Sequence, residues 1–129
     1  MSNIWIAAGD GDLQAVQQFI MSNHNGVNDG DETGYTPMHA AAAYGHKNVI
    51  NWLLSVGGDI NIRDNDGDTP LFHCDTVDAA RYVISHGGLV NVQNSSEMTP
   101  IDQAFEDGNE ELIEFYQTMF PQDFSESMQ

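Results

Sequence analysis

The apolar positions of this 129-residue chain follow a helical spacing in several short segments, each bounded by glycine and polar turn residues. In residues 49–54 and 112–116, apolar side chains occupy adjacent positions and positions three or four apart, which indicates one buried face of an amphipathic helix. These side chains are Val49, Ile50, Leu53 and Leu54 in the first segment, and Leu112, Ile113, Phe115 and Tyr116 in the second. A shorter stretch containing small residues precedes each segment. The pattern therefore predicts pairs of short helices.

A Thr-Pro pair recurs along the chain with a period close to 33 residues. The pairs begin at Thr36, Thr69 and Thr99, and an asparagine lies eight residues before each threonine. Proline at the first helical position loses no hydrogen bond, and the hydroxyl of the threonine before it can cap the helix start. Self-similarity at this period predicts an array of repeated helical units.

The segment beginning at Thr36, TPMHAAAAYGHKNVINWLLSVGGDIN, resembles the ankyrin repeat, whose signature is Thr-Pro-Leu-His-x-Ala at a period of 33. The resemblance implies an all-α ankyrin-repeat solenoid of about four helix-turn-helix units, joined by β-turn loops that project as fingers. The expected domain covers residues 1–120 in units of about 2–33, 34–66, 67–96 and 97–120, and residues 121–129 form a short polar tail.

Three of the four units depart from this repeat. The first lacks Thr-Pro and has Trp5 where the family has histidine, and the fourth has Asp102 there. Terminal repeats are often atypical, because each covers only one neighbour. The third unit is three residues shorter than the second, with the gap between Cys74 and Val77. Because the third unit is internal, capping does not explain its length.

The charge is the unusual feature of the composition. Twenty acidic residues oppose three basic ones, giving a net charge of −17. Such a chain repels nucleic acid and anionic membranes, so a strong electrostatic partner should be cationic. The alternative is that the acidity only maintains solubility.

The sequence also limits where such a chain would work. It has no apolar run of about 18 residues and no basic N-terminal segment, so we expect neither a membrane span nor a signal peptide. The single Cys74 excludes disulfides and cysteine-based zinc sites. We therefore expect a cytoplasmic or nuclear protein that is monomeric when free and carries no cofactor.

The residues with possible chemistry are better explained by structure. The ankyrin resemblance makes His39 a structural tether, and Cys74 fits a small buried slot. No nucleophile elbow is present, so we expect no enzyme and no catalytic residue. Residues 64–68, DNDGD, suggest calcium, but an EF-hand would need an oxygen ligand at Ile62 and a glutamate at His73. We therefore predict a turn there and no metal site.

The candidate partner-binding residues lie on the fingers and on the variable positions of the first helices. They are Asp10, Glu32, Tyr35, Tyr44, Asp66, Asp68, Glu106 and Asp107. Asp31 and Asp64 match the turn-forming aspartate of the family, whereas Asp66 and Asp68 have no expected structural role. Arg63 is expected to pair with Asp64 or Asp66. The alternative is a solvated acidic face with two half-exposed tyrosines.

These features favour a non-enzymatic module that binds a basic protein through an acidic concave face, as an escort or assembly factor for its client. The escort role is an analogy within the family. The second hypothesis is a regulatory subunit that binds an enzyme through a surface centred on Tyr35 and Tyr44. The two hypotheses differ in whether acids or tyrosines dominate the binding.

Overall fold

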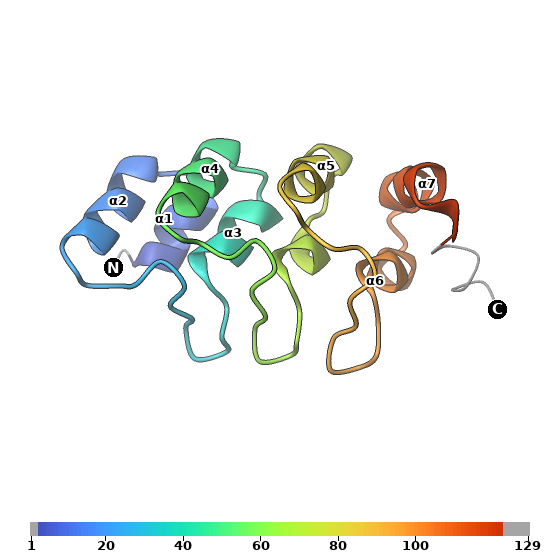
Figure 1. Cartoon of the computed structure of the whole chain (residues 1–129), viewed down its shortest axis with the longest axis horizontal. Coiled ribbons are helices and arrows are strands. Elements are labelled where there is room, and N and C mark those ends of the chain that lie inside the picture. Colours follow the sequence, from blue (N-terminus) through green and yellow to red (C-terminus); the bar gives the residue numbers. More distant parts are fainter. Residues whose placement is uncertain (1–2, 123–129) are drawn as a thin grey trace.

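The computed structural model describes residues 3–122, which fold into seven α-helices and one 3₁₀ turn, with no strand in that range (Figure 1). The elements are α1 (Ile4–Asp10), α2 (Leu13–Met21), α3 (Pro37–Ala43), α4 (Lys47–Ser55), η1 (Pro70–His73), α5 (Val77–Ser85), α6 (Pro100–Asp107) and α7 (Glu110–Met119). Residues 123–129 of the expected tail lie outside the described range.

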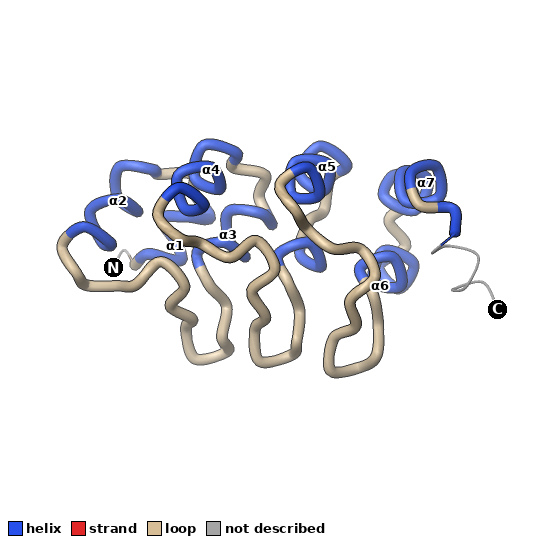
Figure 2. Tube along the Cα trace, in the orientation of Figure 1, coloured by secondary structure: helices blue, strands red, loops and turns tan. Residues whose placement is uncertain are grey.

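The helices form two layers along one axis (Figure 1). The inner layer holds α1, α3, η1 and α6, and the outer layer holds α2, α4, α5 and α7. Along the inner layer α1 packs on α3, α3 on η1, and η1 on α6. Three long loops descend beside one another from the inner layer (Figure 2). The predicted all-α repeat solenoid is confirmed.

The inner helices begin as the sequence predicts. The hydroxyl of Thr36 accepts from the backbone N–H of His39, and the N–H of Thr36 donates to His39 Nδ1 at 3.1 Å. In α6 the N–H of Thr99 donates in the same way to Asp102 Oδ2 at 3.0 Å. Asn3 caps α1 without a Thr-Pro pair. Each of these side chains satisfies an N–H that the helix itself leaves unpaired.

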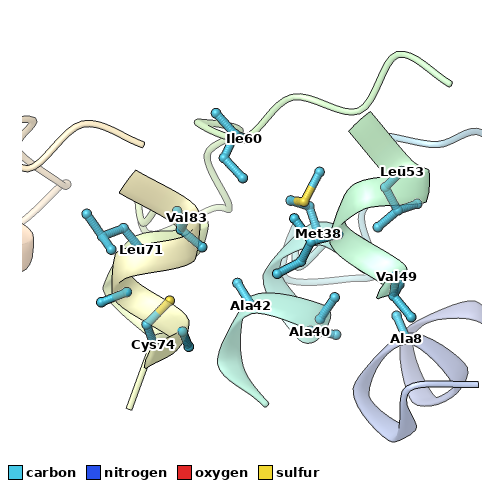
Figure 3. Packing of buried hydrophobic residues seen from close by; sticks show 14 of the residues in the cluster. Ala8, Met38, Ala40, Ala42, Val49, Leu53, Ile60, Leu71, Cys74 and Val83 are labelled. Carbon is cyan, nitrogen blue, oxygen red and sulfur yellow. The ribbon is translucent and has the colours of Figure 1, made fainter. Parts of the chain in front are cut away.

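One continuous core runs between the two layers (Figure 3). Val49, Ile50 and Leu53 of α4 are fully buried, and Leu54 is partly buried. The alanines of α3 are small enough for neighbouring inner helices to approach closely, and Ala41 and Ala42 are fully buried. The labelled side chains in Figure 3 come from the first three units: Ala8, Met38, Ala40, Ala42, Val49, Leu53, Ile60, Leu71, Cys74 and Val83. Burial of these apolar side chains supplies the main driving force for stacking the units.

The three loops, here called fingers, are residues 26–35, 59–68 and 89–98. Asp31, Asp64 and Asn94 each organise a turn, because one Oδ1 atom accepts two backbone N–H groups within its own finger. The backbone N–H of Asn65 donates to Thr33 O of the preceding finger at 2.9 Å. The predicted turn-forming role of Asp31 and Asp64 is confirmed.

The third unit does not form the inner helix that was predicted for it. Its first segment is only the 3₁₀ turn η1, after which Cys74 is extended. Phe72 occupies the position of His39, but its backbone N–H donates to Thr69 O in this turn, so Thr69 Oγ1 is buried without a hydrogen-bond partner among residues 3–122. Thr76 then caps α5 directly. The missing three residues therefore remove the end of the inner helix and leave the outer helix intact.

Candidate binding face

The concave face is built from the inner layer and the fingers, and side-chain hydrogen bonds to finger backbone hold these two parts together. His39 Nδ1 accepts from the Thr36 N–H, so Nε2 carries the ring proton and donates to Asp68 O of the next finger at 2.7 Å. Burial lowers the pKa of His39 below its ordinary value, which favours this neutral form. Trp5 makes a related link in the first unit, since Nε1 donates to Asp29 O at 3.0 Å. The predicted tethering role of His39 is confirmed.

Tyr35 and Tyr44 occupy the middle of this face but have different environments. Tyr35 is half-buried and stacks on His39, with ring centroids 5.5 Å apart. Burial raises the pKa of Tyr35 to about 12, so its phenol stays neutral. Tyr44 is 68% exposed at the end of α3. Tyr35 therefore forms part of the scaffold, and Tyr44 is free to contact a partner.

A first hollow of about 1030 Å³ lies on the N-terminal side of the two tyrosines. Four predicted binding residues line it: Asp10, Glu32, Tyr35 and Tyr44. Trp5, Ile6 and Asp31 line it as well. Burial acts to raise the pKa of Asp31, but hydrogen bonds from Thr33 and Tyr35 hold it below its ordinary value. The hollow thus combines the apolar side chains of Trp5 and Ile6 with three carboxyl groups.

A second hollow of about 360 Å³ lies on the other side of the tyrosines. Its predicted members are Tyr35, Tyr44, Asp68 and Asp107. The sequence analysis missed Phe72, His73, Asp75 and Gln103, which also line it. The available signal was the combination of Phe72 at a histidine position and the shortened chain after Cys74.

Two predicted residues do not join either hollow. Asp66 lies at a finger tip and Glu106 on α6, and both are exposed. The expectation that Asp68 has no structural role was wrong, because Asp68 Oδ1 accepts from Asn94 Nδ2 of the next finger at 2.8 Å. This bond fixes the position of one carboxylate of the second hollow.

Acidic residues line both hollows of this face, whereas no lysine or arginine does. Six carboxylates line the two hollows: Asp10, Asp31, Glu32, Asp68, Asp75 and Asp107. None of the three basic side chains of the chain lines either hollow. Lys47 pairs with Asp78 at 2.9 Å, and Arg81 lies over the Phe115 ring. The expected pairing of Arg63 with a neighbouring aspartate was wrong, since its guanidinium donates to two backbone carbonyls, Gly67 O and Gln93 O.

Among the groups with metal-binding or nucleophilic potential, His39, Asp64, His73 and Cys74 are held in structural contacts. His73 Nε2 lies 3.2 Å from Asp64 Oδ2 and 3.9 Å from Asp68 Oδ2, which joins η1 to the second finger. The ring of His39 lies beside this group, but both of its nitrogens are already bonded. Burial raises the pKa of Cys74 to about 12, so the thiol is protonated and unreactive at neutral pH.

No helix among residues 3–122 has the length and apolar character needed to cross a bilayer. A family model of ankyrin repeats in three copies matches residues 4–76, so the match ends where the third unit is shortened. The ankyrin repeat is in general a non-enzymatic protein–protein interaction module.

Three relatives illustrate the range of proteins that contain similar segments. Ankyrin repeat-containing protein P1E11.10 of Schizosaccharomyces pombe is 49% identical over 83 residues, which cover 64% of this chain and 40% of the relative. Target of rapamycin complex 2 subunit AVO2 of Saccharomyces cerevisiae is 32% identical over 105 residues, covering 75% of this chain and 23% of the relative. Protein phosphatase 1 regulatory subunit 12A of Mus musculus is 33% identical over 98 residues, covering 74% and 10%. The matched segment is thus less than half of each relative. By the family match, this chain belongs to the ankyrin-repeat family.

Proposed function

We propose that this chain binds a protein partner by seating a Lys- or Arg-rich segment of that partner on its concave face. The observation that carries the proposal is that six carboxylates line two hollows that no lysine or arginine of the chain lines. Opposite charge at such a surface steers encounter and selects the partner. A basic protein that needs an escort before it reaches its site of assembly is a client of this kind.

The two hollows meet at Tyr44, which gives the surface an apolar centre. An exposed tyrosine ring can cover the stem of a lysine or stack on a guanidinium, and carboxylates around it can pair with the charged end. Exposed charge pairs are screened by salt, so the affinity should fall steeply as ionic strength rises.

The test compares two variants that lose the same charge on different faces. The concave variant Asp10→Asn/Glu32→Gln removes two carboxylates of the first hollow. The control Glu111→Gln/Glu114→Gln removes two exposed carboxylates of α7 in the outer layer (Figure 1). The probe is a fluorescein-labelled Gly/Ser peptide carrying four arginines, measured by fluorescence anisotropy at low and high salt.

We expect the concave variant to bind the peptide about 10-fold more weakly, as two charge contacts of up to about 1 kcal/mol each allow. The control should change the affinity by less than about 2-fold. Equal losses in the two variants would show that the acidity acts only through bulk charge, and binding that does not respond to salt would show that charge does not drive it. Either result would contradict the proposal.

A regulatory subunit is the second candidate, and the 68% exposure of Tyr44 favours it. Two relatives are named as a complex subunit and as a phosphatase regulatory subunit, which describes those proteins. In this case Tyr44→Ala should abolish binding to an enzyme partner, while Asp10→Asn/Glu32→Gln leaves the affinity nearly unchanged. The reverse ranking supports the basic-segment proposal.

A further inference from the structure

The second hollow exists because the third unit is short. In the second unit, residues Tyr44, Gly45 and His46 connect α3 to α4, and Tyr44 projects into solvent. Thr76 occupies the N-cap position of α5 as His46 does for α4, but only Asp75 lies between Cys74 and this cap, where the second unit has four residues between Ala41 and His46. No side chain equivalent to Tyr44 therefore follows η1. The space that is left open is the second hollow.

Two carboxylates of this hollow are held by side-chain amides. Asp68 Oδ1 accepts from Asn94 Nδ2 of the third finger at 2.8 Å, and Asp107 Oδ1 accepts from Gln103 Nε2, one turn earlier on α6, at 2.9 Å. Each bond fixes one oxygen of its carboxylate. Asp68 Oδ2 is 3.9 Å from His73 Nε2, which is too far for a hydrogen bond. The hollow thus presents carboxylates with fixed positions.

The remaining lining adds a third acid and aromatic surface. Asp75 is exposed at the rim, the exposed Tyr44 lines the same hollow, and Phe72, which is only 7% exposed, contributes to the lining as well. At about 360 Å³ the space is at the small end of ligand pockets, which hold about 300–1,000 Å³. Several carboxylates and aromatic faces around one small space match the planar, five-donor guanidinium group, which bonds in a fork and stacks on rings.

We infer that the second hollow is an arginine pocket, formed by Asp68, Asp75 and Asp107 together with Phe72 and Tyr44, and that it prefers arginine over lysine. The inference rests on the proposed function, because the arginine belongs to the basic segment of the partner. The inference adds a preference between basic side chains. The first hollow binds any positive charge, whereas the second distinguishes a guanidinium from an ammonium group by its shape. An ammonium group is a compact, strongly hydrated charge that gains less from separated carboxylates and rings.

The experiment compares two labelled peptides of identical Gly/Ser sequence that carry four arginines or four lysines at the same positions. Anisotropy at low salt gives both affinities for the intact chain. We expect both peptides to bind, and the arginine peptide to bind about 10-fold more tightly. Asp75→Asn and Phe72→Leu should each reduce this preference to less than about 3-fold, while Asp10→Asn/Glu32→Gln weakens both peptides and preserves the ratio.

The outcomes separate the two proposals. If neither peptide binds, the proposed function is wrong and the arginine pocket is wrong with it. If both peptides bind with the same affinity, or if Asp75→Asn leaves the preference unchanged, the concave face binds basic segments but the pocket does not exist. Asp75 is exposed, so its variant should fold even if Phe72→Leu does not; far-UV circular dichroism checks both variants.

Discussion

The second and third units start with the same Thr-Pro pair, yet only the second builds a full inner helix. In the second unit His39 caps α3 and reaches the next finger; in the third unit Phe72 does neither, and the helix shrinks to η1. Both units nevertheless keep their core positions filled, since Leu71 and Cys74 are buried as Met38 and Ala41 are. The buried core side chains are therefore enough to stack the third unit on its neighbours. The inner helix can be shortened without losing this stacking, and the second hollow lies beside the shortened segment.

The first test of this contrast replaces one histidine in each unit, His39 in the second and His73 in the third. His39→Ala should lower the free energy of unfolding by about 3 kcal/mol, because it leaves Thr36 N–H and Asp68 O unpaired and opens a cavity. His73→Ala should cost less than about 1 kcal/mol, since this ring is 30% exposed and its ion pair is weak. Urea unfolding followed by circular dichroism measures both.

A similar loss in the two variants would mean that the histidine of the third unit is as important a tether as His39. That result would contradict the contrast between the two units.

The second test exchanges the threonine hydroxyl for a methyl group in each unit. Thr36→Val removes the cap of α3 and should cost about 1–2 kcal/mol. At Thr69 the hydroxyl oxygen is buried with no partner among residues 3–122, so Thr69→Val should change stability by less than about 0.5 kcal/mol, or increase it. Thermal melts of the paired variants give the difference, and an equally large loss at Thr69 would show that its hydroxyl has a partner after all.

Sequence reasoning reached the fold because the repeat is local: Thr-Pro caps, small inner residues and helical apolar spacing each act within one unit. It also placed the three-residue gap of the third unit between Cys74 and Val77. It could not foresee the collapse of the helix, because this depends on backbone geometry after a deletion. The second hollow was missed for a related reason, since its lining includes residues of α3, the second finger, η1 and α6, and Asn94, which binds Asp68, lies 26 residues further along the chain.

The site prediction succeeded where one residue acts alone and failed where partners come from elsewhere. Tyr44 is exposed on the concave face as a variable family position should be. Asp68 was expected to be free, but an amide 26 residues away binds it. Arg63 was expected to form an ion pair, but backbone carbonyls of two loops bind it instead. Carbonyl and amide partners of this kind follow from how the fingers stack, which the order of residues does not state.

The smallest expected effect is a pH dependence that His39 contributes and that Phe72, at the same position of the third unit, cannot contribute. Burial lowers the pKa of His39 below its ordinary value of 6.5, so between that value and the folded pKa the unfolded chain binds a proton that the folded chain does not. Stability from this group is therefore fully present above pH 6.5 and is lost as the pH falls toward the folded pKa. From pH 7 to pH 6 the loss should be at most about 0.7 kcal/mol.

The measurement compares the pH profile of stability for the unaltered chain with that for His39→Gln. The groups around the ring are the same in both proteins, so subtracting one profile from the other isolates the contribution of His39. These groups are Asp64, Asp68, His73 and Tyr35. A His39→Gln profile parallel to that of the unaltered chain would mean that His39 is not held neutral, and the assignment of its Nε2 proton to the bond with Asp68 O would fall with it.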